Sequence, residues 1–140
     1  FKLVQRNFAE SLAGYSLVCY VLQVKDRHNG NILLDNEGHL MHIDFGFMLA
    51  SSPGSLGWES APLKLTAEFV EVLDGPQSSM FTYFRALLLR GFLELRKHMD
   101  RLVLVAEMMA RGPLRLPCFY GGQAVLDALR DRFQMSLTED

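Results

Sequence analysis

Apolar residues recur at three- and four-residue steps near the start of the chain, which predicts a helix from about Asn7 to Val24. The recurring positions are Phe8, Leu12, Tyr15, Cys19 and Leu22. Leu17, Val18 and Val21 make other faces of this helix apolar as well. A helix that is apolar most of the way round is buried on several sides, so we expect this one at the centre of the domain.

Two short apolar runs follow, from Ile32 to Leu34 and from Leu40 to Ile43. The five residues between them, 35–39, are turn formers with a glycine where a positive φ is expected. This pattern predicts a β-hairpin. The segment from Phe47 to Leu65 is then rich in Ser, Gly and Pro, which predicts a loop of about twenty residues.

The helical period returns in four later segments. They are Thr66 to Leu73, about Ser79 to His98, the series Leu102, Val105, Ala106 and Met109, and the series Leu126, Leu129 and Phe133. The predicted fold class is therefore α+β, mainly helical, with one small hairpin.

Composition narrows the class of protein. The chain has 140 residues, of which 49% are hydrophobic and 21% charged, as expected for one globular domain. The net charge is −2 without a long basic run, so a nucleic-acid partner is not expected. Cys19 and Cys118 are not spaced as metal ligands, which favours a reduced, intracellular protein. The longest apolar stretch is too short to span a bilayer. Because the first residue is Phe1 rather than Met, we expect a fragment.

Two strings carry the chemistry: Asp26-Arg27-His28-Asn29-Gly30-Asn31 and Asp44-Phe45-Gly46. A carboxylate, an amide five residues later and a second carboxylate beside glycine form the set that phosphoryl transfer from ATP requires. Asp26 is the candidate proton acceptor. Asn31 and Asp44 are the candidate magnesium ligands, because magnesium prefers oxygen and completes its shell with water and phosphate. The predicted hairpin brings these two ligands together.

Other residues near these strings leave alternatives open. His28 either assists proton removal or stabilises phosphate charge as imidazolium, unless it is purely structural. Arg27 is expected to anchor the catalytic loop through carboxylate or backbone contacts, with a phosphate contact as the alternative. Leu33 and Ile43 either form the floor of an adenine-binding pocket or belong to the core of the hairpin. His42 is expected to be structural, and a zinc site of His28, His39 and His42 would match no standard zinc spacing.

The two strings, with His42-Ile43 before Asp44, resemble the phosphoinositide kinase superfamily. The chain is also similar to type III phosphatidylinositol 4-kinases, more to the beta than to the alpha form. Four further strings carry this similarity: Ser52-Pro53, Leu56-Gly57-Trp58-Glu59, Lys64-Leu65-Thr66 and Leu116-Pro117-Cys118-Phe119. The resemblance covers essentially all 140 residues. It implies the C-terminal lobe of a two-lobed kinase fold.

The resemblance also implies a reaction and its setting: transfer from ATP, with Mg²⁺, to the 4-hydroxyl of phosphatidylinositol. By motif position, Asp26 would be the proton acceptor, with His28 assisting. Asn31 and Asp44 would be the metal ligands, and Leu33 and Ile43 would line the nucleotide pocket. The enzyme would be cytoplasmic and peripheral on the cytosolic face of Golgi-type membranes. Nothing in the chain resembles the glycine-rich loop or the ATP-pairing lysine of kinases, so an upstream N-terminal lobe would be required.

The loop after Phe47 is the expected substrate loop. Up to Phe69 its only formal charges are Glu59, Lys64 and Glu68, which suits a lipid whose inositol ring bears no further phosphate. Lys64 and Trp58 are its candidate substrate residues, and Trp58 either lies at a membrane surface or packs back into the core. Two rival functions remain: a non-catalytic kinase-lobe remnant that acts as a binding module, and a phosphoinositide-kinase-like protein kinase.

Overall fold

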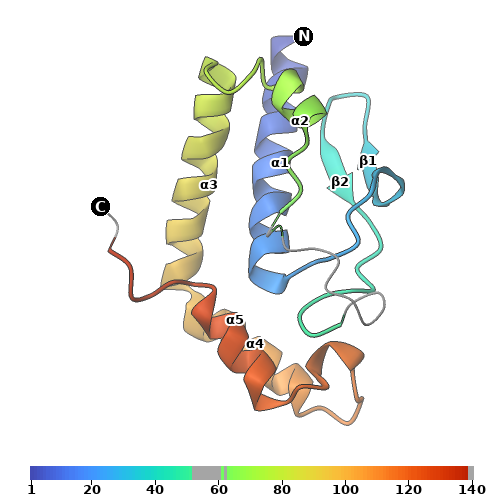
Figure 1. Cartoon of the computed structure of the whole chain (residues 1–140), viewed down its shortest axis with the longest axis vertical. Helices are drawn as coiled ribbons and strands as arrows, with labels where there is room; N and C mark the ends of the chain where they lie inside the picture. Colours follow the sequence, from blue (N-terminus) through green and yellow to red (C-terminus); the bar gives the residue numbers. More distant parts are fainter. Residues whose placement is uncertain (52–60, 62, 139–140) are drawn as a thin grey trace.

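The computed structural model describes residues 1–51, 61 and 63–138 of the chain. Helices dominate, and two short strands form an antiparallel hairpin (Figure 1). In chain order the elements are α1 (Lys2–Leu22), η1 (Asn29–Asn31), β1 (Ile32–Leu34), β2 (Leu40–His42), α2 (Ala67–Val72), α3 (Ser79–Lys97), α4 (Met99–Ala110), η2 (Pro117–Phe119) and α5 (Gln123–Asp131). The predicted α+β class is confirmed.

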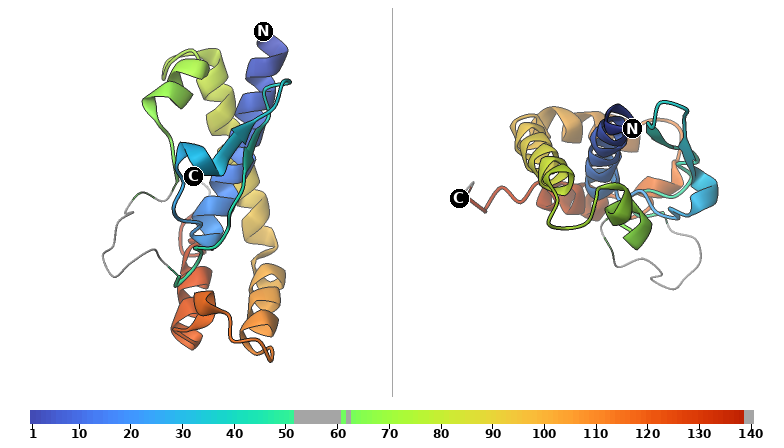
Figure 2. Two further views of the ribbon diagram at one scale, coloured as in Figure 1. Left: turned by 90° about the vertical axis from the view of Figure 1, so that its right-hand side faces the viewer. Right: turned by 90° about the horizontal axis from the view of Figure 1, so that it is seen from above.

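Helix α1 lies between α3 on one side and the hairpin on the other, as the two views of Figure 2 also show. Its apolar faces therefore have partners on both sides, which confirms the predicted central helix. The helix begins earlier than its apolar period indicates. Gln5 is buried in the first turns, and its Nε2 donates to the carbonyl oxygen of Val72 at 2.7 Å.

Helices α1 and α3 run side by side in the same direction (Figure 1). Gly91 permits their closest approach, because a Cβ on it would lie 2.4 Å from Cδ1 of Leu17. Around the upper half of α1, one buried cluster joins this helix to β2, α2 and α3. Its members are Phe8, Ala9, Leu12, Ala13, Leu40, Leu73 and Phe84.

A second buried cluster holds the lower end of the molecule together, where α4 and α5 pack against each other (Figure 1). Its members are Val21, Leu49, Val103, Ala106, Val125, Leu126, Leu129 and Phe133. Leu49 belongs to the segment that follows the second chemical string, so this cluster also fixes the start of the predicted substrate loop. Among the described residues, no helix is long and apolar enough to cross a membrane.

The hairpin pairs Ile32 with His42 and Leu34 with Leu40. Along β2 the side chains of Leu40 and His42 are buried, whereas Met41 between them is exposed. One face of the hairpin thus packs on α1, and Ser11 of α1 accepts a hydrogen bond from the Leu40 amide at 2.9 Å. Strand β2 ends one residue before the predicted boundary at Ile43.

Candidate active site

The hairpin register places the two candidate metal ligands at neighbouring positions. The amide of Ile43 donates to the carbonyl oxygen of Asn31 at 3.0 Å, one step beyond the Ile32–His42 pair. Asp44 follows directly on this bonded residue. Residues thirteen positions apart in the sequence therefore meet at the open end of the hairpin, as the sequence predicts.

Both candidate carboxylates lie on left-handed backbone. Asp26 has a φ of 60° and Asp44 a φ of 57°. Aspartate enters this region more readily than most residues, but the conformation remains uncommon outside glycine. Uncommon backbone conformations persist where the surrounding structure holds them, and they cluster at functional sites.

Asn31 connects the two strings through its side chain. The residue is 7% exposed, and its Nδ2 donates to the carbonyl oxygen of Asp26 at 2.9 Å. This bond uses the Nδ2 atom and fixes the orientation of the Asn31 side chain, so its Oδ1 atom can serve as a cation ligand. Asn31 therefore holds Asp26 in place while it presents the atom type that magnesium prefers.

The His28 ring is oriented by its own loop. Its Nδ1 accepts a hydrogen bond from the Gly30 amide at 3.0 Å, and its Nε2 lies 3.9 Å from Oδ2 of Asp26. Because Nδ1 is an acceptor, the neutral ring carries its proton on Nε2. Gly30 allows the ring to come this close, since a Cβ there would lie 2.9 Å from Cε1 of His28.

Arg27 joins the two strings through backbone contacts, one of the two kinds that the sequence predicts. Its Nε donates to the carbonyl oxygen of Lys25 at 3.0 Å and its Nη1 to that of Ile43 at 2.7 Å. Its Nη2 donates to the carbonyl oxygen of Asp44. The side chain is 7% exposed, and its guanidinium carbon lies 5.6 Å from the centre of the Phe45 ring.

The donor set fits a magnesium ion that is held together with a nucleotide. Asn31 and Asp44 supply an amide oxygen and a carboxylate, and phosphate oxygens and water would complete the shell. Within the described part of the chain, no three His, Cys, Asp or Glu side chains gather to hold a metal without such help. The three histidines of the zinc alternative have separate partners: His39 pairs with Asp35 at 2.9 Å, His42 stacks on Tyr15, and His28 accepts from the Gly30 amide.

His42 is packed beneath the site, against α1. Its ring stacks on Tyr15 with centroids 4.6 Å apart, and its Nδ1 lies 3.4 Å from Sγ of Cys19. Burial, followed by the positive charges of Arg27 and Lys64, lowers the pKa of His42 to about 4. The ring is therefore neutral at physiological pH and is a structural link between α1 and β2.

The outer face of the hairpin is apolar and open. Leu33 is 46% exposed and Ile43 is 40% exposed. Leu33 pairs with Met41, and side chains alternate along a strand, so Leu33, Met41 and Ile43 share this face. The two predicted nucleotide-pocket residues thus lie on one surface beside Asp44, and the hairpin-core alternative is wrong for both of them.

The predicted substrate loop is tied to the catalytic loop at its far end. Nζ of Lys64 donates to Oδ1 of Asn29, between His28 and Gly30, at 3.0 Å. At its near end, Nζ of Lys25 donates to the carbonyl oxygens of Leu49 and Ser51 at 2.7 and 3.0 Å. Trp58 lies outside the described residues. No sequence pattern distinguishes Asn29 or Lys25, because both roles depend on contacts with residues far away in the chain.

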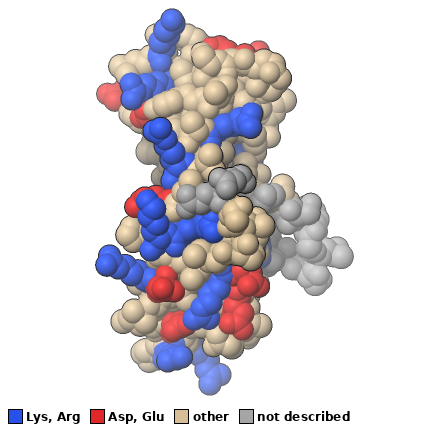
Figure 3. Space-filling view, turned by 90° about the vertical axis from the view of Figure 1, so that its left-hand side faces the viewer, with Lys and Arg blue, Asp and Glu red and all other residues tan. Residues whose placement is uncertain are grey.

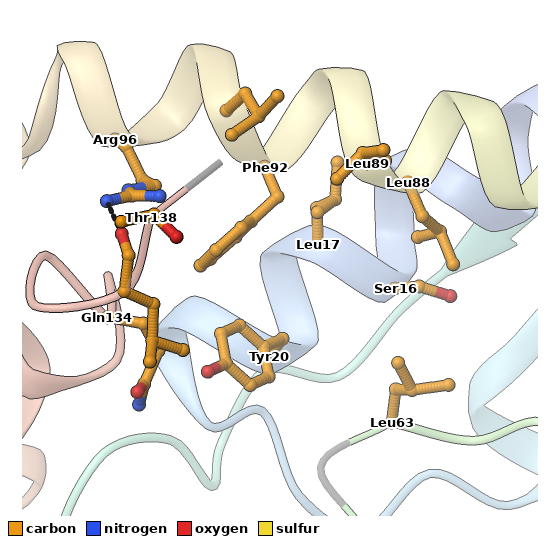
Figure 4. Close-up of a pocket in the computed structure, with 12 residues that line it drawn as sticks. Ser16, Leu17, Tyr20, Leu63, Leu88, Leu89, Phe92, Arg96, Gln134 and Thr138 are labelled. Carbon is orange, nitrogen blue, oxygen red and sulfur yellow. Dashed lines mark hydrogen bonds between the residues drawn. The ribbon is translucent and has the colours of Figure 1, made fainter. Parts of the chain in front are cut away.

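A hollow of about 370 Å³ lies between α1, α3 and the C-terminal segment (Figure 4). Leu17, Tyr20 and Phe92 form much of its wall, and Leu63, next to Lys64, stands at its edge. Its charged lining residue is Arg96, which donates to the carbonyl oxygen of Leu137 at 2.8 Å. An apolar hollow of this kind does not suit phosphate, so the chemistry belongs to the loops and not to this hollow.

Charges on the far side of α3 are mixed. In Figure 3, basic and acidic side chains lie next to one another over the lower half of the molecule. Among the described residues, Lys97 pairs with Glu94 at 2.8 Å, and Arg130 pairs with Glu107. These two cations neutralise neighbouring carboxylates, which makes them less suited to bind a phosphate.

Comparisons with known proteins agree with this geometry. Residues 1–116 match the family model described as phosphatidylinositol 3- and 4-kinase. The whole chain is 58% identical over 144 residues to phosphatidylinositol 4-kinase beta 1 of Arabidopsis thaliana and covers 13% of that protein. It is 56% identical over 140 residues to phosphatidylinositol 4-kinase beta of Xenopus tropicalis and of Rattus norvegicus, and it covers 17% of each. The chain thus spans less than a fifth of the length of these curated relatives.

Proposed function

The chain belongs to the phosphatidylinositol 3- and 4-kinase family, and we propose that the protein containing it transfers the γ-phosphate of ATP to the 4-hydroxyl of phosphatidylinositol. The product would be phosphatidylinositol 4-phosphate. One observation carries this proposal: Asn31 donates to the carbonyl oxygen of Asp26 and accepts from the Ile43 amide, so that Asp26, Asn31 and Asp44 meet at one end of the hairpin. Relatives that are 56–58% identical to the whole chain are named phosphatidylinositol 4-kinase beta.

Asp26 is the proposed proton acceptor for the attacking hydroxyl. Its carboxylate is partly exposed beside His28, and its main chain is fixed by the Asn31 amide. Removal of the proton as the phosphoryl group transfers would make the inositol oxygen a better nucleophile.

His28 is proposed to donate to a phosphate oxygen, not to act as the base. Its Nδ1 already accepts from the Gly30 amide, so its Nε2–H, 3.9 Å from Oδ2 of Asp26, is the group left to donate. A donor at this position would stabilise charge on the transferring group and support Asp26.

Asn31 and Asp44 are proposed to hold Mg²⁺ with the phosphates of ATP. The bound ion would neutralise charge on the β- and γ-phosphates. Leu33 and Ile43 would form an apolar floor beside it for the adenine, and the glycine-rich loop and lysine of an N-terminal lobe would cover the phosphates from the other side.

The substrate loop is proposed to select the lipid. Its formal charges between Phe47 and Phe69 are Glu59, Lys64 and Glu68, a balance that suits a headgroup with one bridging phosphodiester. Lys64 would contact that phosphodiester, and Trp58 would rest at the membrane surface. By its resemblance to beta-type phosphatidylinositol 4-kinases, the protein would be cytoplasmic and peripheral on the cytosolic face of Golgi-type membranes.

The test uses the complete protein with phosphatidylinositol vesicles, ATP and Mg²⁺. Asp44→Asn and Asn31→Ala should each lower turnover by at least about 100-fold while the melting temperature stays close to that of the parent, because the first loses the carboxylate charge at the metal and the second loses an oxygen ligand. Asp26→Asn should lower kcat more than it raises KM for the lipid. Near-parental turnover in either metal-ligand variant would overturn the assignment.

A further inference from the structure

Arg27 is buried between the two chemical strings, and its three bonded nitrogens all reach main-chain carbonyls. One carbonyl belongs to Lys25, just before the catalytic loop, and the other two belong to Ile43 and Asp44 of the metal loop. A single planar group therefore spans both loops. Burial and this bonding pattern rule out the alternative of a phosphate contact for the side chain as it lies in this structure.

The bonded carbonyls are the ones that set the direction of the two aspartates. Arg27 follows Asp26 directly, and its side chain holds the carbonyl of Asp44 itself. Both aspartates adopt left-handed backbone, at φ values of 60° and 57°. Because such conformations are costly for residues other than glycine, bonds that hold them determine where the carboxylates point.

We propose that Arg27 is a positioning residue that sets the geometry of the metal site, holding the Asp44 backbone in its left-handed conformation against the catalytic loop. The proposal rests on the proposed phosphoryl transfer, since it concerns the same two loops. Arg27 touches neither metal nor substrate in this account. It acts through Asp44, as outer-shell partners of metal ligands do.

The shape of the guanidinium matters as well as its charge. Its donors lie in one fixed plane and can reach three carbonyls at once, whereas a lysine ammonium is a single point on a flexible stem. Arg27→Lys keeps the charge and should lose part of the bonding. Arg27→Met removes all of the bonding while filling similar space. The two variants therefore separate geometry from charge.

The experiment measures metal affinity as well as activity, in the complete protein. Binding of Mn²⁺ in the presence of a non-hydrolysable ATP analogue is followed by electron paramagnetic resonance, and lipid-kinase rate is followed against Mg²⁺ concentration. Arg27→Lys should weaken Mn²⁺ binding and raise the half-saturating Mg²⁺ concentration, and Arg27→Met should do so by about 10- to 100-fold. KM for phosphatidylinositol should change by less than about twofold in both variants.

Arg132 provides the matched control. Its Nη1 also donates to a main-chain carbonyl, that of Tyr20, and its guanidinium carbon lies 5.8 Å from the Tyr20 ring. Arg132→Met should lower the melting temperature and leave Mn²⁺ affinity unchanged. A third variant, Arg27→Ala, tests the role of the guanidinium group itself. Added guanidinium ion should restore part of the Mn²⁺ affinity that this variant loses.

Two results would overturn the positioning role. The first is parental Mn²⁺ affinity in both Arg27→Lys and Arg27→Met. The second is unfolding of both variants, which would make Arg27 an anchor of the fold with no separate effect on the site. Failure of the proposed function would look different, because the unsubstituted protein itself would then phosphorylate no phosphatidylinositol.

Discussion

Acidification should destabilise the contact between α1 and the hairpin through His42. This ring is 7% exposed, and its pKa is lowered to about 4, mainly by burial. In the unfolded chain the pKa of a histidine is about 6.5. Because the folded value is the lower one, the unfolded chain takes up the proton first as the pH falls. The stabilisation is therefore complete above about pH 6.5 and is lost progressively between about pH 6.5 and pH 4.

The size of this loss follows from the two pKa values. They differ by about 2.5 pH units, and each unit corresponds to about 1.4 kcal/mol, so the whole effect is about 3 kcal/mol. At pH 5, where the unfolded histidine is protonated and the folded one is still neutral, about 2 kcal/mol should already be lost. This is a large fraction of the stability of an ordinary domain.

Hydrogen–deuterium exchange measures this loss locally, as the opening free energy of amides in α1 and β2 at pH 7.5 and pH 5. His42→Asn removes the titration, so its opening free energy should fall by about 2 kcal/mol less than that of the parent between the two pH values. His98→Asn is the control, because His98 lies on the surface in an ion pair with Glu94. Equal pH dependence in the parent and in His42→Asn would refute the reasoning.

Three further predictions concern local geometry and charge. Gly30→Ala should lower kcat at least about tenfold without unfolding the protein, because its Cβ would lie 2.9 Å from Cε1 of His28 and would displace that ring. Steady-state kinetics and a thermal melt would measure the two effects. Gly38→Ala should lower the free energy of unfolding by about 2 kcal/mol or more, measured in urea, because φ is 90° there and the Cβ would lie 2.5 Å from the Val4 carbonyl oxygen. Ser51→Arg should raise binding of more phosphorylated phosphoinositides relative to phosphatidylinositol in vesicle competition, and added salt should reduce that gain.

Two glycines serve as controls for these substitutions. A Cβ on Gly14 or on Gly75 would meet nothing within 4 Å. Gly14→Ala should leave kcat near the parental value and raise the free energy of unfolding by about 0.5–1 kcal/mol, because Gly14 lies exposed inside α1. Gly75→Ala should cost only the strain of its φ of 86°, and a cost equal to that of Gly38→Ala would contradict the steric argument.

Much of the site could be predicted from the sequence because its chemistry depends on spacing. A short hairpin between Asn31 and Asp44 leaves few ways to arrange the two ligands, and turn residues mark that hairpin clearly. The register observed for Ile32 and His42 brings Asn31 and Asp44 to the same end of the hairpin, as the sequence predicts; their role as ligands stays a prediction. The family resemblance drawn from the two strings is likewise confirmed by the comparisons.

Other features could not be predicted because they depend on tertiary contacts. The beginning of α1 is stabilised by a bond from Gln5 to Val72, far away in the chain, and no local pattern reports it. The bridge from Lys64 to Asn29 joins two exposed side chains 35 residues apart. The three-carbonyl bonding of Arg27 likewise required coordinates, because the sequence alone left backbone, carboxylate and phosphate partners open.

The central claim is tested most directly by the position of the transferred phosphate. The complete protein and its Asp44→Asn variant would each be incubated with phosphatidylinositol vesicles, Mg²⁺ and labelled ATP, and the deacylated lipid products would be separated by regioisomer. We expect label on the 4-position of inositol for the parent protein and at least about 100-fold less for the variant. Label on another hydroxyl, label on protein alone, or equal labelling by the two proteins would contradict it.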